Sequence, residues 1–336
     1  MSASTEPSFA NFLAIIRQAF SKKLCLAPPS LHHECSGNII RAHSVQRGGD
    51  GLKRIADNGH VDGTEPKFGK IPSLARIGIN KASTFTGFCG KHDTSLFLPL
   101  EMGEFTGSDL QIFLLTYRAL CRELYVKRGS ITQSSEIAGL DIHEAVEAMI
   151  HDDLYASDLS LAELLVYKTT ADAMLLNGDT SQLRHYMFSF DDVPQVMCNS
   201  WSSAEFDFLG RIAQHITVTR EPVQGLAFNM LGTKTGGAAI FSWIDRGSQE
   251  KRMTESLEAL TDLTAPDDLV RFCFEFCENI YLGPKWWATV PKDDADRLMR
   301  RIVSGTPFGG ERSRHCLIGD GVKSATWKVV SRSRKP

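Results

Sequence analysis

Residues 24–43 read LCLAPPSLHHECSGNIIRAH, and residues 84–93 read TFTGFCGKHD. Together the two stretches contain four side chains that bind zinc in proteins: Cys25, Cys35, Cys89 and His92. A zinc ion takes thiolate and imidazole ligands in one tetrahedral site, and four protein ligands make a closed, structural site. The sequence therefore predicts a Cys3His zinc site that holds a loop-rich N-terminal segment together.

The spacing of these ligands leaves alternatives open. Nine residues separate Cys25 from Cys35, which is wider than the two to four residues common in zinc knuckles. His32 and His33 lie in that gap and compete as ligands. Three buried and unreactive thiols are the alternative to a metal site.

Length and composition are those of a folded protein. The chain has 336 residues, with 42% hydrophobic and 23% charged residues, and its length predicts two or three domains. Eight cysteines are too few for a disulfide scaffold, and no run approaches the roughly 18 apolar residues of a membrane helix. The N-terminus shows no secretory signal pattern. We therefore expect a cytoplasmic protein, where clustered Cys and His indicate metal binding, and no membrane partner.

Three segments differ in composition. Residues 1–105 are rich in Gly and polar turns, residues 106–180 have a helical apolar period, and residues 181–336 hold short β-rich runs and further helices. The β-rich runs do not alternate regularly with helices, which favours an α+β fold over a doubly wound parallel sheet. We expect a zinc-stapled N-terminal finger, a helical middle, and a C-terminal α+β domain of unknown role that contains an antiparallel sheet.

Local signals place the helix ends. An amphipathic helix is expected over residues 9–20. Ser108 is a candidate N-cap and Gly129 a candidate stop of the next helix, and breaks are expected near Ser157 and Gly178.

The C-terminal part carries strand and core signals. Gly236-Gly237 favours a hairpin, residues 267–282 favour a helix, and Cys273 and Cys277 on that helix are expected in the core. The aromatic cluster at Trp286 is expected to close a core, although aromatic rings can also stack on bases. Strands are expected at residues 184–190, 194–201, 215–221, 224–231, 236–244 and 327–333.

One resemblance covers residues 24–101. The order of two cysteines, a strand that ends in His43, a long loop and then Phe88-Cys89-x2-His92-Asp93 resembles the treble-clef HNH (His-Me finger) endonucleases. The stretches AHSVQR, GHV, ASTFTGFCGKHD and LFLPLE are also similar to those of a family of uncharacterised bacterial proteins with this arrangement. The resemblance implies a treble-clef or ββα-like finger braced by zinc.

The resemblance also implies a function, a metal-dependent nucleic-acid endonuclease, with bacterial defence as one setting. It implies His43 as general base on water, and Asp93, with His60, as holder of a catalytic Mg²⁺ or Mn²⁺. DNA is favoured over RNA as the partner. Basic side chains near the site would contact phosphates: Arg41, Arg47, Lys53, Arg54 and Lys91.

Two departures from the family pattern favour an alternative. Ala42 stands where the family has an acid, and Asp93 stands where it has its last metal-binding histidine. His60, Asp62 or Asp57 would replace the missing ligand, or the site is inactive. The alternative is a non-catalytic zinc protein that binds nucleic acid, senses or scaffolds, with His43 as a zinc ligand or a packed histidine.

Charge is distributed unevenly along the chain. The net charge is −3, but residues 41–92 carry nine basic and four acidic residues (+5), and residues 297–336 carry ten and two (+8). Basic segments of this kind suit contact with a phosphate backbone, whereas a solvated surface is the alternative. Nothing in the sequence indicates an oligomeric state.

Overall fold

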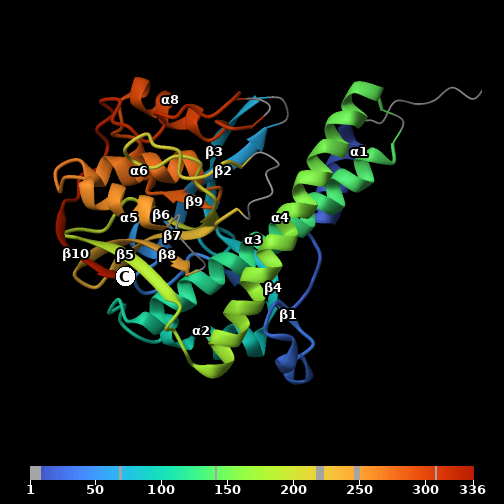
Figure 1. The fold of residues 1–336 in the computed structure, drawn as a ribbon, viewed down its shortest axis with the longest axis horizontal. Coiled ribbons are helices and arrows are strands. Elements are labelled where there is room, and N and C mark those ends of the chain that lie inside the picture. Colours follow the sequence, from blue (N-terminus) through green and yellow to red (C-terminus); the bar gives the residue numbers. More distant parts are fainter. Residues whose placement is uncertain (1–8, 68–69, 141, 217–222, 246–249, 307–308) are drawn as a thin grey trace, which may run out of the picture.

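The computed structural model describes residues 9–67, 70–140, 142–216, 223–245, 250–306 and 309–336. The fold mixes helices with antiparallel sheet (Figure 1). Two strands from the N-terminal part, β1 (Ile39–His43) and β4 (Thr84–Cys89), pair antiparallel in a small sheet of their own. The expected α+β class with an antiparallel sheet is confirmed.

A large antiparallel sheet forms the body of the molecule. Among the described residues it has eight strands in the order β10-β5-β8-β7-β6-β9-β2-β3. Its strands are β2 (His60–Lys67), β3 (Lys70–Gly78), β5 (Leu183–Phe190), β6 (Val196–Ser202), β7 (Leu226–Thr233), β8 (Gly236–Ile244), β9 (Ile280–Leu282) and β10 (Val329–Lys335).

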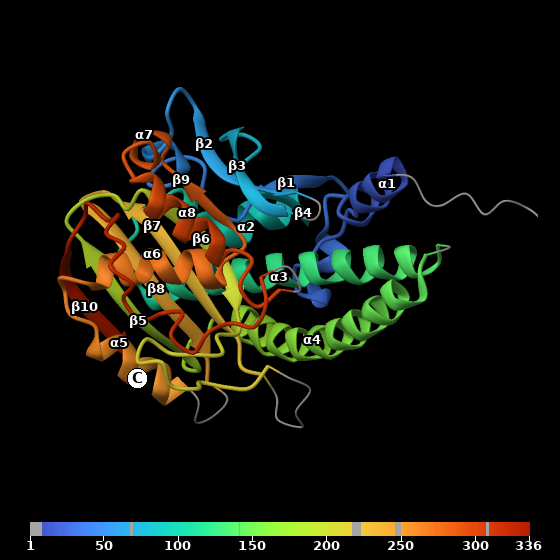
Figure 2. The ribbon, with the colours of Figure 1, turned by 90° about the horizontal axis from the view of Figure 1, so that it is seen from above.

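Helices cover both faces of this sheet, and α3 and α4 form a long hairpin that extends beyond it (Figure 2). None of the helices in the described ranges is both long and apolar enough to cross a membrane. The helices are α1 (Phe9–Ala19), α2 (Gly90–Glu101), α3 (Asp109–Ala138), α4 (Glu144–Asn177), α5 (Glu250–Ala259), α6 (Ala265–Phe276), α7 (Pro284–Trp287) and α8 (Lys292–Arg301), and two 3-10 turns are η1 (Pro29–Glu34) and η2 (Leu52–Arg54).

Strand β8 shows why the sheet needs cover on both faces. Its side chains alternate between two hydrophobic clusters, because successive residues of a strand point to opposite faces. Phe241 and Trp243 pack with Phe272 of α6, whereas Ile240 packs with Leu120 of α3. Every residue of β8 is buried, which explains its continuous apolar sequence.

The helical middle of the chain is confirmed, with two corrections. The Ser108 hydroxyl caps α3 by accepting from the backbone N–H of Gln111, and α4 ends before Gly178, whose φ is +65°. Gly129 does not end α3, because the helix continues to Ala138 and a Cβ at residue 129 would lie 2.7 Å from ring carbons of Phe20. The expected break near Ser157 is also wrong, since α4 runs through this buried residue.

The sheet crosses the expected domain boundary at residue 105. The hairpin β2–β3 lies in the segment expected to be loop-rich, yet β2 pairs with β9, with Asp62 opposite Leu282. Residues 1–105 therefore share a sheet with residues 181–336. The expected helix over residues 267–282 ends at Phe276, and Ile280–Leu282 is strand β9 instead.

The other C-terminal expectations have clear outcomes. Thr233 pairs with Gly236, so the hairpin is confirmed, but its two-residue loop is Lys234-Thr235, and Gly236 and Gly237 lie in β8. Cys273, Cys277 and Trp286 belong to the main core, as expected. The strand expected at residues 215–221 lies mainly outside the described residues.

Buried polar contacts join the small sheet region to the large sheet. The Asn279 side-chain amide donates to Ser44 Oγ and to the Asn199 carbonyl, both at 2.8 Å. The Tyr281 hydroxyl accepts from the Ser83 backbone N–H at 2.7 Å. Ser44 directly follows β1 and Ser83 directly precedes β4, so these bonds fix the ends of both strands against the body.

Candidate metal centre and adjoining cleft

Four predicted ligands come from three parts of the chain. Cys25 precedes η1 and Cys35 follows it, so this turn brings the two cysteines back to one side. Cys89 is the last residue of β4, and His92 lies in the first turn of α2. Because Ile39 pairs with Cys89 in the small sheet, the turn that carries Cys35 ends close to the start of α2.

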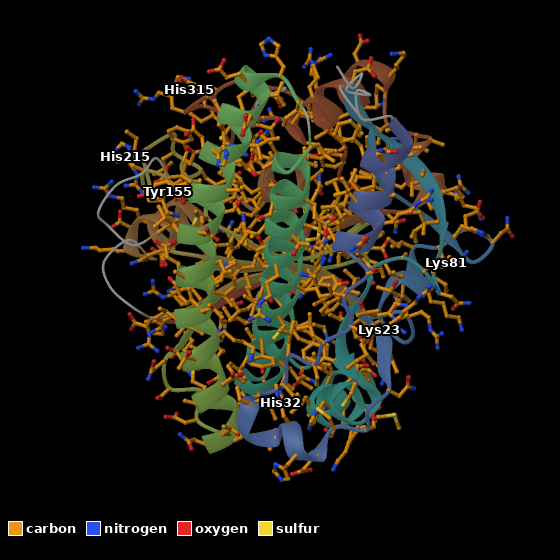
Figure 3. The ribbon with its side chains drawn as sticks, turned by 90° about the vertical axis from the view of Figure 1, so that its right-hand side faces the viewer. Lys23, His32, Lys81, Tyr155, His215 and His315 are labelled. Atoms are coloured by element: carbon orange, nitrogen blue, oxygen red, sulfur yellow. The ribbon has the colours of Figure 1, made fainter. Side chains whose placement is uncertain are left out.

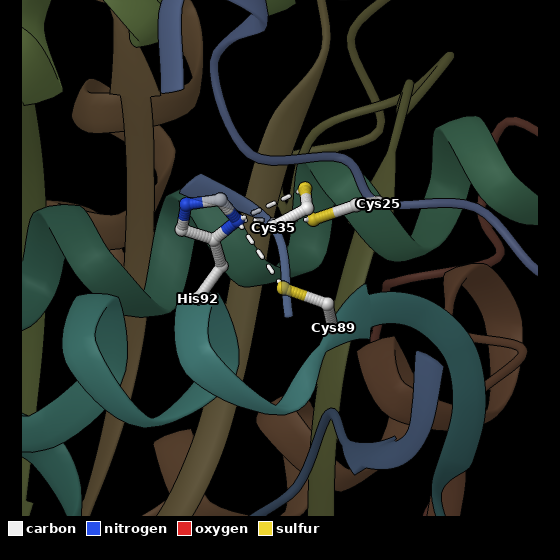
Figure 4. Close-up of side chains that lie close together, drawn as sticks. All are labelled: Cys25, Cys35, Cys89 and His92. Atoms are coloured by element: carbon white, nitrogen blue, oxygen red, sulfur yellow. Dashed lines mark hydrogen bonds between the residues drawn. The ribbon is translucent and has the colours of Figure 1, made fainter. Parts of the chain in front are cut away.

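The ligand atoms converge on one point. His92 Nδ1 lies 3.4 Å from Cys25 Sγ, 3.5 Å from Cys35 Sγ and 3.3 Å from Cys89 Sγ (Figure 4). All four atoms lie within 4.8 Å of one another. Bond lengths of 2.0–2.3 Å to a tetrahedral zinc ion place the ligand atoms roughly 3.5 Å apart. The cluster therefore has the dimensions of a metal site.

The ionisation of two of the ligands also suits a cation, whereas burial and the neighbouring Cys25 and Cys89 raise the pKa of Cys35 to about 11. Burial lowers the pKa of His92, which favours the neutral imidazole that binds metal. Burial would raise the pKa of Cys89, but hydrogen bonds from the backbone at His92 and Ser36 bring it down to about 7. A thiolate therefore forms readily at the start of α2.

The competing ligands are engaged elsewhere. His32 Nε2 lies 2.9 Å from the Ala27 carbonyl, and His33 Nδ1 lies 2.8 Å from the Ser30 carbonyl. His43 does not join the cluster either. The described residues thus contain one Cys3His cluster that can hold a metal ion, and it consists of the four residues expected from the sequence.

A cleft of about 400 Å³ lies beside this centre. Its lining includes His43 at the end of β1, and Asp93 and Glu101 from α2. Arg41 and Arg47 also line it, and both are exposed. The structure therefore brings the expected base and the expected acid into one opening, next to two of the expected phosphate contacts.

The His43 ring is held in one tautomer. Its Nε2 lies 3.2 Å from the Ile79 carbonyl oxygen. A carbonyl only accepts hydrogen bonds, so Nε2 carries the hydrogen and Nδ1 carries the lone pair. Burial lowers the pKa of His43, which favours the neutral ring at neutral pH. The side chain is half-buried, and its unprotonated nitrogen can act as a base.

The acidic side of the cleft contains an unpaired oxygen. Asp93 is 9% exposed, and its Oδ1 has no hydrogen-bond partner among the residues that the structure describes. Burial raises the pKa of Asp93 to about 6, although the nearby Arg118 guanidinium acts in the opposite direction. A buried carboxylate oxygen without a partner is costly and suits a cation or a proton.

Glu101 was not identified by the sequence analysis. It ends α2, eight residues after Asp93, and accepts a 2.9 Å hydrogen bond from the fully buried Arg118. The Arg118 guanidinium carbon also lies 4.0 Å from the centre of the Phe97 ring. The only available signal was that Glu101 closes the LFLPLE stretch, and no spacing rule connects it to Asp93.

The alternative cation ligands lie outside the cleft lining. His60 is exposed at the start of β2, and its Nδ1 lies 2.8 Å from the Asn58 carbonyl. Asp62 accepts from Arg76 at 2.7 Å, and Asp57 pairs with Lys285 at 3.2 Å. The structure does not bring His60 to His43 and Asp93.

Of the basic candidates, three lie outside the cleft lining and two belong to it. Arg54 donates to Asp50 and to the Thr233 carbonyl, and Lys91 pairs with Glu34 at 2.7 Å. Lys53 is exposed on η2 but does not line the cleft. Arg47 donates to Asn80 at 3.2 Å and still lines the cleft, as Arg41 does.

Much of the basic C-terminal segment is neutralised within the fold. Arg301 and Arg312 both pair with the buried Glu275, at 3.1 and 3.0 Å. Further along, Arg332 pairs with Asp262 and Lys335 with Asp109. These ion pairs favour a structural role for the C-terminal charges over contact with phosphates.

Comparison of the chain with protein-family models, with curated proteins and with solved structures finds no match. The functional argument therefore depends on the chemistry of the metal centre and the cleft. Those two features share helix α2, which supplies His92 to the centre and Asp93 to the cleft.

We expect Cys89→Ser to lose the bound metal ion, because it removes one of four ligands and leaves three that hold a cation more weakly. Elemental analysis of the purified chain measures this as a fall from one metal ion per chain toward none. Cys121→Ser is the matched control, since Cys121 is buried on α3 outside the cluster. Equal metal content in both variants would contradict the assignment of the centre.

Proposed function

We propose that this chain is a metal-dependent nucleic-acid endonuclease that hydrolyses phosphodiester bonds and carries a structural zinc ion in its Cys3His centre. The observation that supports it most is that His43 and Asp93 line one cleft beside that centre. A base for water and a carboxylate for a cation are the two groups that this hydrolysis requires.

The zinc ion has a structural role in this proposal. Three thiols and one imidazole supply four protein ligands, which leaves no open position for water or substrate. His92 is 2% exposed, so the centre is shielded from solvent on that side. Zinc would fasten the η1 turn to the start of α2.

The local fold supports the resemblance to HNH endonucleases. Strands β1 and β4 pair antiparallel, and α2 follows β4 directly. His43 ends the first strand and Asp93 lies on the helix, which is the order that the resemblance implies. The hairpin β2–β3 is an insertion between the two strands.

The cleft residues have separate roles in the proposed reaction. His43 would accept the proton of the attacking water at Nδ1, while its Nε2–H donates to Ile79. Asp93 would hold a Mg²⁺ or Mn²⁺ ion through its unpaired Oδ1, with Glu101 as the second carboxylate of the cleft. Such an ion, when bound, stabilises the negative charge that develops on the phosphate. Arg41 and Arg47 would contact phosphate oxygens.

The proposed site does not require an acid at residue 42, where the HNH family has one and this chain has Ala42. It is 2% exposed and pairs with Phe85 across the small sheet, so the position belongs to the core of the finger. An acid there would be buried. The carboxylates of α2 would supply the cation ligands in its place.

A non-catalytic nucleic-acid-binding zinc protein is the second candidate. It is favoured by the ion pair between Arg118 and Glu101, which occupies one of the two carboxylates of the cleft. In that case the cleft would bind phosphate without cleaving it. Cleavage assays separate the two candidates.

We expect His43→Ala to lower the rate of plasmid nicking in Mg²⁺ or Mn²⁺ by about 100-fold or more, because it removes the proposed base. Gel analysis of supercoiled plasmid measures the rate, and metal content checks that the zinc centre remains. His60→Ala is the matched control and should nick at the wild-type rate. Nicking by His43→Ala at the wild-type rate, or none by any form of the protein, would overturn the proposal of an endonuclease.

We expect the double change Arg41→Ala with Arg47→Ala to weaken DNA binding, because it removes two proposed phosphate contacts. The slope of log K against log salt should become shallower by about 2. Binding titrations at several salt concentrations measure both effects. Lys91→Ala is the comparison, because the Lys91 ammonium is already paired with Glu34 and should contribute less. A smaller loss in the double variant than in Lys91→Ala would show that the cleft does not face the DNA.

A further inference from the structure

The outer face of α4 carries an unusual share of exposed apolar side chains. Of sixteen large hydrophobic residues that are exposed in the described chain, seven lie on this one helix. They are Val146, Met149, Tyr155, Leu159, Leu165, Val166 and Leu176. Scattered exposed apolar residues are ordinary, whereas a concentration on one element marks an interaction surface.

The opposite face of α4 is already occupied. Leu164, Tyr167, Ala171 and Met174 are buried in the cluster that also contains residues of α3. Figure 3 shows Tyr155 on the side of α4 that faces away from α3. Val146 and Met149 lie five helical turns before Leu164 and Tyr167 and share their side of α4, whereas the other five exposed residues form a second apolar face.

This second face has the spacing of a coiled-coil seam. Nine positions from residue 148 to residue 176 follow one another at alternating steps of four and three, and seven of them are apolar. All nine are exposed: Ala148, Asp152, Tyr155, Leu159, Ala162, Val166, Thr169, Ala173 and Leu176. An average period of 3.5 residues keeps a seam facing a partner helix over many turns. The required occupant is therefore another helix.

The charges of α4 exclude two other occupants. In its N-terminal half Asp152 occupies a seam position, and Glu147 and Asp158 lie beside the seam. These acidic residues would repel nucleic acid and anionic membranes. Beyond Glu163 the two charged residues, Lys168 and Asp172, are buried and paired with each other. One half of the seam is thus acidic and the other half is uncharged at its surface.

We propose that the outer face of α4 is a dimer interface, which packs antiparallel against α4 of a second copy of this chain. A parallel pair would set the acidic half against itself, whereas an antiparallel pair sets it against the uncharged half. The same patch then contacts itself across a two-fold axis, as in most homodimers.

The seam residues complement one another about an axis at Ala162. In the antiparallel pair Leu159 meets Val166 of the second copy, and Tyr155 meets Thr169. Ala148 meets Leu176, so a small side chain lies opposite a large one. Ala162 lies opposite itself, where its small side chain lets the two backbones approach. The seam spans about 42 Å at 1.5 Å per residue.

Light scattering of the full-length chain during gel filtration tests the interface. Wild type should elute with twice the mass of the chain, and Leu159→Glu combined with Val166→Glu should elute as a monomer with unchanged circular dichroism. Leu263→Glu is the control, because Leu263 is 88% exposed away from α4 and should leave the dimer intact. A monomeric wild type, or a dimer that survives the double change, would overturn the proposal.

Disulfide trapping tests the direction of the helices. Ala162→Cys should form a cross-linked dimer under mild oxidation, because the two copies of residue 162 meet at the axis. Ala148→Cys should not, because the two copies of residue 148 lie at opposite ends of the seam. Wild type, with its eight native cysteines, is oxidised alongside as the background. Equal cross-linking of the two variants above background would contradict the antiparallel pair.

Discussion

The convergence of three thiols and one imidazole joins the start of helix α2 to the segment around η1. Cys25 and Cys35 lie on a turn that has little apolar surface of its own, and none of the residues of η1 is buried. The shared centre joins this turn to Cys89 and His92, and the ion pair between Glu34 and Lys91 at 2.7 Å is a second link. A cation bound at the centre would replace the hydrophobic core that so short a segment lacks, as metal ions do in other small elements. The adjacent cleft inherits its geometry from the same helix.

Hydrogen bonds from the long helices and the large sheet hold the segments around this centre. The hydroxyl of Tyr117 on α3 donates to Asp172 of α4 at 2.7 Å and lies 3.2 Å from the Leu26 carbonyl oxygen. The residue next to Cys25 is thereby tied to both long helices. On the other side, Asn279 and Tyr281 hold the segments that flank β1 and β4. The region around the centre is therefore built into the larger fold, and its ligands lie as far apart in sequence as Cys25 and His92.

The sequence alone predicted those features of the site that depend on residue type. Cysteine and histidine have few roles in which four of them converge, so residue type indicated the metal ligands, although the spacing left His32 and His33 as competitors. Glycine was less informative: Gly178 ends a helix, but Gly129 only makes room for Phe20, and the two cases look alike without the tertiary contact. Strand β2 was missed because its Gly63 and Glu65 interrupt the apolar alternation. Glu101 was missed because its relation to the cleft arises from α2 and Arg118 together.

Zinc-edge X-ray absorption of the purified chain measures the central claim most directly. The account predicts a first shell of three sulfur ligands at about 2.3 Å and one nitrogen ligand at about 2.0 Å, in a tetrahedral arrangement without bound water. A first shell with fewer sulfurs, with added oxygen, or no stoichiometric zinc in the folded protein would contradict it.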